Sequence, residues 1–164
     1  METKIKEDEY VYIDTINANF SSSLKLEVEF KLYVLGIDNN DNYFLYKLFT
    51  TAKNVGTTTV NFSNKNISTT FRVNGALSLS TTFRRGSIAP NETITVSAYS
   101  SKQIPLNQNV VLRSFVGDGT LEFYNEKTFY FVAYKPIYYN GIAVNNVYYN
   151  GTQANSITYN GTPL

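Results

Sequence analysis

A strict alternation between apolar and polar residues constrains the fold of this chain more than any other feature. It runs from residue 24 to residue 35, where the apolar series is Leu24, Leu26, Val28, Phe30, Leu32 and Val34 and the series between them is Lys25, Glu27, Glu29, Lys31 and Tyr33. Successive side chains of a strand point to opposite faces, so this period of two buries one face and leaves the other in water. The pattern predicts a long β-strand over residues 24–35.

The alternation stops at a segment that favours a turn. Residues 36–42 contain one Gly, three Asn and two Asp, which tolerate positive φ angles or cap their own backbone. Residues 43–50 follow and are rich in aromatic side chains, which fit a strand. We therefore expect the two strands to form a long antiparallel hairpin.

Further short segments with strand character continue to residue 134, and no window shows helical periodicity. These segments are residues 57–62, 69–73, 76–83, 92–100, 109–115, 120–124 and 128–134. Turn signals separate them about every 8–12 residues, and Asn74-Gly75 is a pair typical of a tight hairpin. The sequence therefore predicts an all-β protein. Its main body, residues 10–135, is expected to be an antiparallel β-sandwich of the jelly-roll or immunoglobulin-like type, preceded by a charged N-terminal arm at residues 1–9.

The C-terminal part of the chain is a repeat. After Lys135-Pro136, where proline cannot donate to a central ladder, a ten-residue unit occurs three times. The units contain Ile137-Tyr138-Tyr139-Asn140-Gly141, Val147-Tyr148-Tyr149-Asn150-Gly151 and Ile157-Thr158-Tyr159-Asn160-Gly161. Asn-Gly favours a two-residue hairpin turn, so residues 136–164 are predicted to form a short β-meander of Tyr-Asn-Gly hairpins.

The composition argues against several classes of function. The 164-residue chain has no Cys and no His, which removes the usual ligands of zinc and the commonest general base. Its net charge is +1, so nothing attracts nucleic acid electrostatically. The first residues lack the apolar run of a signal peptide, and no stretch approaches the length needed for a membrane span. We expect a protein made in the cytoplasm that neither binds nucleic acid nor inserts into a membrane.

The remaining polar residues give weak candidates for chemistry. Asp38, Asn40 and Asn42 superficially resemble a calcium loop, but the Gly and Glu required at its sixth and last positions are replaced by Tyr43 and Phe49. The few carboxylates that could form a hydrolytic pair are Glu27, Glu29, Asp118, Glu122 and Glu126, all on predicted solvent faces or turns. Arg84-Arg85 could grip an anion, although a solvated strand end explains it more simply. We expect no catalytic residues, no metal and no cofactor.

The tyrosines are the best candidates for an interaction surface. The chain has 14 Tyr, and six of them fall in the last 31 residues. Tyr is amphipathic and is enriched where a protein surface meets another protein or a sugar. The body tyrosines are explained well enough by strand preference. The repeat tyrosines have no evident core of their own, so the candidate interaction residues are Tyr138, Tyr139, Tyr148, Tyr149 and Tyr159.

The repeats resemble a known class of proteins. Tyr138-Tyr139-Asn140-Gly141, Tyr148-Tyr149-Asn150-Gly151 and Tyr159-Asn160-Gly161 are similar to the aromatic-Asn-Gly repeats at the ends of tail and baseplate proteins of bacteriophages that infect low-GC Gram-positive bacteria. The Thr/Ser-rich strands and Val116-Gly117-Asp118-Gly119-Thr120 look loosely like the β-sandwich modules of those proteins. The resemblance implies a virion protein that contacts other virion proteins or copies of itself, and that in some cases binds cell-surface polysaccharide.

Three functions remain open at this point. The first is a non-catalytic structural protein of a bacteriophage tail, baseplate or fibre that contributes to assembly or host-surface attachment, with the repeats as a docking ribbon. The second is a capsid decoration or head-fibre protein. The third is a carbohydrate-binding β-sandwich module that uses exposed Tyr as sugar platforms.

Overall fold

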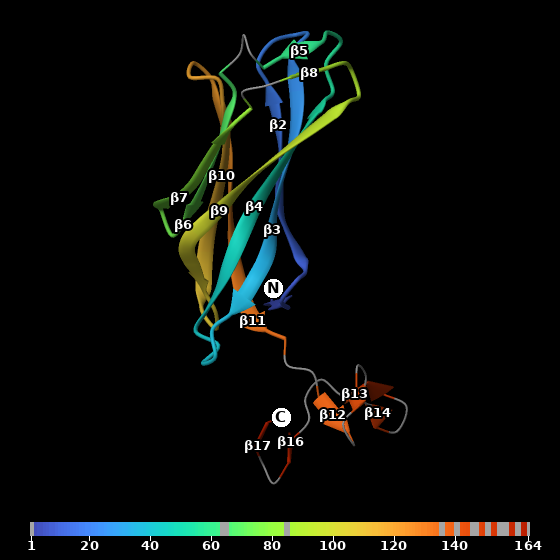
Figure 1. Cartoon of the computed structure of the whole chain (residues 1–164), viewed down its shortest axis with the longest axis vertical. Helices are drawn as coiled ribbons and strands as arrows, with labels where there is room; N and C mark the ends of the chain where they lie inside the picture. The colour runs from blue at the N-terminus through green and yellow to red at the C-terminus, as the bar shows by residue number, and fades with distance from the viewer. Residues whose placement is uncertain are drawn as a thin grey trace. The chain divides into compact units, whose positions relative to one another are not determined.

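The computed structural model is built from β-strands (Figure 1). It describes residues 2–62, 66–83, 86–134, 137–139, 142–144, 148–149, 152–153, 158–159 and 162–163. The chain divides into two compact units, Met1–Ala133 and Tyr134–Leu164. Over the described ranges, no helix is long and apolar enough to cross a membrane.

Four long strands form the first sheet of the N-terminal unit, in the order β2-β3-β4-β9. They are β2 (Tyr10–Asn19), β3 (Lys25–Ile37), β4 (Tyr43–Asn54) and β9 (Thr93–Pro105). All neighbours in this sheet are antiparallel. The hairpin predicted from the alternation is confirmed, because β3 pairs with β4 and the apolar residues from Leu26 to Val34 are fully buried.

Five strands form the second sheet, in the order β1-β11-β10-β6-β7. They are β1 (Glu2–Ile5), β6 (Ser68–Val73), β7 (Ala76–Thr82), β10 (Asn109–Gly117) and β11 (Glu122–Ala133). Only the β1–β11 pair of this sheet is parallel. A small pair, β5 (Val60–Asn61) with β8 (Ser87–Ile88), lies near one end of the sandwich (Figure 1).

The two sheets enclose one hydrophobic core, which makes the unit a β-sandwich. Aromatic rings meet across the interior: Phe44 of β4 packs against Phe131 of β11 with ring centroids 5.4 Å apart, and Tyr46 of β4 lies 6.0 Å from Phe71 of β6. All four side chains are fully buried. Each such side chain stabilises the fold by about 1.5–3 kcal/mol through burial alone. The all-β sandwich predicted from the sequence is therefore confirmed.

The Asn-Gly turn between β6 and β7 follows the prediction. Asn74 and Gly75 have φ angles of 49° and 78°, as a tight turn with two left-handed residues requires. Asn74 adds a further role, because its side-chain Oδ1 accepts a hydrogen bond of 2.9 Å from the Val111 N–H of β10. This turn is thereby tied to the neighbouring strand of the sheet.

The strand boundaries differ from the prediction in several places. Residues 2–5, expected in a charged arm, form β1 and bury Ile5 completely. Residues 120–124 and 128–134 were expected as two strands, and the structure has the single strand β11. The segment 57–62 was expected as a strand, and only Val60–Asn61 pairs. The separate strand β2 was not predicted, because a bulge between Tyr12 and Asp14 shifts the phase of its alternation.

The described residues of the C-terminal unit form three short hairpins, as the repeats predicted, but not the continuous meander that was expected. Its strands are β12 (Ile137–Tyr139), β13 (Ile142–Val144), β14 (Tyr148–Tyr149), β15 (Thr152–Gln153), β16 (Thr158–Tyr159) and β17 (Thr162–Pro163). They pair as β12–β13, β14–β15 and β16–β17, each a separate two-stranded antiparallel sheet. The Asn-Gly residues between the paired strands lie outside the described residues.

Candidate functional site

A groove lies at one edge of the sandwich, between an edge strand of one sheet and an edge strand of the other. β2 is one of the two edge strands of the four-stranded sheet, and β1 is one of the two edge strands of the five-stranded sheet. β1 pairs only with Tyr130–Ala133, at one end of β11. The groove has a volume of about 620 Å³ and is lined by residues of β1, β2 and β11, among them Lys4, Tyr10, Tyr12 and Lys127.

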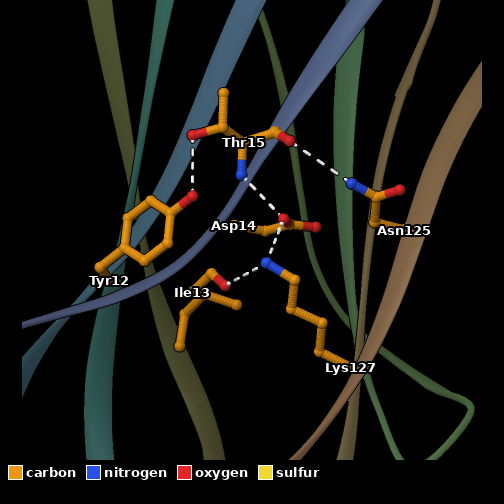
Figure 2. Close-up of polar contacts among 6 residues, drawn as sticks. All are labelled: Tyr12, Ile13, Asp14, Thr15, Asn125 and Lys127. Carbon is orange, nitrogen blue, oxygen red and sulfur yellow. Dashed lines mark hydrogen bonds and ion pairs between the residues drawn. The ribbon is translucent and has the colours of Figure 1, made fainter.

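A buried carboxylate lies beside this groove because of the bulge in β2. After the bulge, Asp14 turns inward and is only 3% exposed. Lys127 of β11 reaches across from the other sheet, and its Nζ lies 2.7 Å from Asp14 Oδ1 (Figure 2). The same carboxylate oxygen accepts a 2.8 Å hydrogen bond from the Thr15 N–H. The charge of Asp14 is thus neutralised by a residue more than a hundred positions away in the sequence.

Side chains of β11 also bond to the free carbonyl groups of the β2 edge. Lys127 Nζ donates to the Ile13 carbonyl at 3.5 Å, and Asn125 Nδ2 donates to the Thr15 carbonyl at 3.4 Å. Figure 2 shows both side chains extending from β11 toward β2. An open strand edge is a template for unwanted pairing with other chains. Asn125 and Lys127 occupy part of that edge and hold the two sheets together.

Tyrosine rings form the outer wall of the groove. Tyr10 is 58% exposed and Tyr12 is 50% exposed. Tyr10 packs edge-to-face against Tyr33 and Phe49, with centroid distances of 5.0 and 5.3 Å. Tyr12 donates a 3.0 Å hydrogen bond from its hydroxyl to Thr15 Oγ1. We call Tyr10, Tyr12, Tyr33 and Phe49 the aromatic patch; it lies on the outer face of the four-stranded sheet and continues into the groove.

Cations lie against the rings of this patch. Lys47 Nζ is 5.0 Å from the centre of the Phe49 ring, and Lys127 Nζ is 5.7 Å from the centre of the Tyr12 ring. An ammonium group at such a distance is attracted by the negative face of the ring. The patch therefore combines flat apolar surfaces with positive charge at its borders.

The connection between β1 and β2 is anchored beside the patch. Tyr33 donates a 3.1 Å hydrogen bond from its hydroxyl to Asp8 Oδ1, and this bond to a carboxylate, with the desolvation of the phenol and the negative charge of Asp8, raises the pKa of Tyr33. Asp8 takes a positive φ of 61° and donates its N–H to the Val34 carbonyl at 3.0 Å. Glu7 Oε1 accepts a 2.8 Å bond from the Ile37 N–H. The acidic residues of this segment thus hold the chain against β3.

The five tyrosines predicted as interaction residues lie in the strands of the C-terminal unit. In register, Tyr138 is opposite Ala143, Tyr139 opposite Ile142, Tyr148 opposite Gln153, Tyr149 opposite Thr152 and Tyr159 opposite Thr162. Their side chains lie outside the described part of the structure, so the interaction role stays a prediction.

The aromatic patch was missed by the sequence reasoning. One signal was present: the alternation over residues 24–35 placed Tyr33 on the wet face of its strand. Tyr10 and Tyr12 also alternate with the buried residues Val11 and Ile13. What the sequence could not reveal is that β2 and β11 lie at the same edge of the sandwich.

Several of the weak candidates for chemistry make structural contacts. Asp38 Oδ2 accepts bonds from the N–H and the side-chain amide of Asn42, as in a turn. Glu29 pairs with Lys31 at 2.8 Å, and Asp118 Oδ1 accepts two backbone N–H groups of its own turn. The described residues contain no cluster of three His, Cys, Asp or Glu that could hold a metal ion. Arg84 and Arg85 lie outside the described residues.

Comparison with protein-family models gave no matching family, and comparison with curated proteins gave no match.

Proposed function

We propose that this chain is a non-catalytic structural protein of a bacteriophage virion, from the tail, the baseplate or a fibre, and that it contributes to assembly, to host-surface attachment or to both. The observation that carries the proposal is the series of three hairpins at ten-residue spacing, whose Tyr-Asn-Gly sequences resemble the terminal repeats of phage tail proteins. The partners would be other virion proteins and further copies of this chain. The protein would reside in the virion.

The mechanism follows from the size of the hairpins. Each has strands of only two or three residues, and an isolated two-stranded hairpin is marginally stable in water even when it is longer. The repeats carry five tyrosines and almost no charge. Docking onto another protein surface would bury these side chains and stabilise the hairpins. Several copies in one symmetric assembly would multiply weak contacts through a high effective concentration.

The test is a truncation after Lys135, which keeps the whole N-terminal unit and its core. Molar mass would be measured by size-exclusion chromatography with light scattering for the full chain and for residues 1–135. We expect an oligomer that becomes a monomer on truncation, while the circular dichroism of the sandwich is retained. If the truncated protein forms an oligomer with the same number of copies as the full chain, the proposed docking role is wrong.

The aromatic patch supports a second candidate, a carbohydrate-binding module. Tyr10 and Tyr12 present half-exposed rings beside an open groove, which is the arrangement that a sugar ring needs for stacking. Binding of cell-wall polysaccharide would be measured by calorimetry for the wild type and for Tyr12→Ala. We expect the variant to lose binding and the control Val55→Ala, which truncates an exposed residue elsewhere, to keep it. Unchanged affinity of Tyr12→Ala would argue against this candidate.

A further inference from the structure

Two arginines lie side by side on the outer face of the five-stranded sheet. Arg72 of β6 and Arg113 of β10 are directly opposite each other in the register of the two strands. Like charges in this position repel, and the repulsion destabilises the strand pair. A residue pair that opposes folding in this way needs either a structural compensation or a ligand of opposite charge.

Aromatic rings hold both guanidinium groups in place. Arg72 Cζ lies 5.2 Å from the centre of the Phe115 ring. Arg113 Cζ lies 5.9 Å from the Phe115 ring and 5.5 Å from the Tyr124 ring, and the two rings are 5.7 Å apart. A guanidinium that stacks through its plane keeps its N–H edge available for hydrogen bonds. The four side chains form one cation–aromatic cluster.

Among the described residues of this sheet, Arg113 has an acidic partner and Arg72 has none. Arg113 donates from Nε to Glu126 Oε2 at 2.6 Å, and its Nη2 contacts the same oxygen. Arg72 is exposed, and neither its own strand β6 nor the neighbouring strands β7 and β10 contain any Asp or Glu. The cluster therefore carries one uncompensated positive charge, positioned at Arg72.

An exposed ring and two hydroxyl groups surround the cluster. Tyr124 is 60% exposed and presents its ring to solvent. Thr70 of β6 is opposite Phe115 of β10, and Ser80 of β7 is opposite Thr70. These two residues add hydroxyl groups to the row of side chains that crosses the sheet at Phe115. Rings and hydroxyl groups together offer a sugar a stacking surface and hydrogen-bond partners. The rings, the hydroxyl groups and the guanidinium group lie on neighbouring strands, which are about 5 Å apart.

We propose that the outer face of the five-stranded sheet, centred on Arg72, Phe115 and Tyr124, binds a saccharide that carries an oxyanion, either a carboxylate or a phosphate. The oxyanion would accept two parallel hydrogen bonds from Arg72, and a sugar ring would stack on Tyr124. This site is on a different sheet from the groove. It does not rest on the proposed virion role, which concerns the C-terminal hairpins.

The experiment is a titration of the ¹⁵N-labelled full chain followed by amide chemical shifts. The probes are trigalacturonate for the carboxylate, glucose 6-phosphate for the phosphate, and maltotriose as a neutral saccharide. We expect shifts confined to β6, β10 and β11 with one or both anionic probes, at a Kd of about 1 mM, and none with maltotriose at that concentration. Which anionic probe binds more tightly decides between the two oxyanions.

Two variants assign the contacts. Arg72→Gln should weaken binding at least about tenfold because the charge-assisted hydrogen bonds are lost. Lys53→Gln, which removes the same charge from the other sheet, should leave the affinity unchanged. Tyr124→Ala should weaken binding and Tyr124→Phe, which keeps the ring, should retain it. The proposal is overturned by absence of shifts on this sheet, by equal binding of maltotriose, by equal affinities of Arg72→Gln and Lys53→Gln, or by stronger binding of a hexaglutamate peptide than of any saccharide.

Discussion

At the scale of single residues, Thr50 has a polar group in the core. It is fully buried in β4, and its Oγ1 has no hydrogen-bond partner within the described residues. An unpaired buried hydroxyl costs free energy, so we expect Thr50→Val to raise the free energy of unfolding by about 0.5–1.5 kcal/mol. Urea unfolding, monitored by tyrosine fluorescence, would measure this change in the free energy of unfolding. The control is Thr69→Val. The Thr69 hydroxyl is hydrogen-bonded to the Thr81 hydroxyl at 2.7 Å, so its removal should destabilise the protein. Destabilisation of equal size in both variants would contradict the prediction.

A second residue-scale prediction concerns the pKa of Tyr33. The hydrogen bond to the Asp8 carboxylate stabilises the neutral phenol and raises its pKa above the ordinary value of about 10. A raised pKa in the folded state means that the stabilisation is present below pH 10 and is lost as the pH rises through the folded-state pKa. We expect Asp8→Asn to lower the pKa of Tyr33, measured by ¹³C NMR titration of the tyrosines. Glu27→Gln should not change it. If the pKa of Tyr33 stays raised in Asp8→Asn, the Asp8 carboxylate is not the main cause of the shift.

At the scale of elements, the link between β2 and β11 is the contact to test. Removal of the ammonium group in Lys127→Met leaves the buried Asp14 carboxylate without its ion pair. We expect a loss of about 1–3 kcal/mol, less than for a fully buried pair because the Lys127 side chain is 46% exposed.

A double-mutant cycle separates this pair from general effects. Asp14→Asn combined with Lys127→Met should recover part of the loss, because no buried charge then remains. Lys31→Met removes the exposed partner of Glu29 and should cost less than about 0.5 kcal/mol. Additive effects of the Asp14 and Lys127 substitutions in urea unfolding would show that the two side chains do not act together.

The same elements show how far sequence reasoning reaches. The β3–β4 hairpin was predictable because an uninterrupted period of two specifies which face is buried. β2 was not, because after its bulge the buried positions change from Val11 and Ile13 to Asp14 and Ile16. β11 was divided into two because Asn125 and Lys127 interrupt its apolar face. Those polar residues fit the fold only because β2 lies opposite them, which is a tertiary contact that local patterns do not encode.

At the scale of the whole molecule, the candidate groove is a product of topology. Its walls come from β1 and β2 and from β11, which begins more than a hundred residues later in the sequence. The three strands meet because each lies at or next to the edge of its sheet. The sequence predicted an interaction surface at the tyrosines of the repeats, a prediction that stays untested, and the structure places two other exposed tyrosines, Tyr10 and Tyr12, at this edge. The cluster of Arg72, Arg113 and Phe115 likewise could not be predicted without knowing that β6 pairs with β10.

The N-terminal strand gives the last prediction, because it joins the two sheets. β1 pairs with Tyr130–Ala133 and buries Ile5 completely, and the chain then crosses directly to β2 of the other sheet. Deletion of residues 1–6 should therefore expose the edge of β11 and lower the free energy of unfolding by about 3–5 kcal/mol, since it removes a strand and a buried apolar side chain. The single change Ile5→Ala should account for about 2–4 kcal/mol of this loss.

Urea unfolding gives the size of the effect, and amide hydrogen exchange locates it. Exchange should become faster at the amides of residues 130–133, whose partner strand is removed. Lys4→Ala, on the exposed side of β1, should change the stability by less than about 0.5 kcal/mol. If the deletion leaves both the unfolding midpoint and the exchange of β11 unchanged, residues 1–6 behave in solution as the charged arm that their composition suggested. If both change as expected, the burial of Ile5 outweighs the effect of the six charged residues in segment 1–9, and β1 is part of the sandwich.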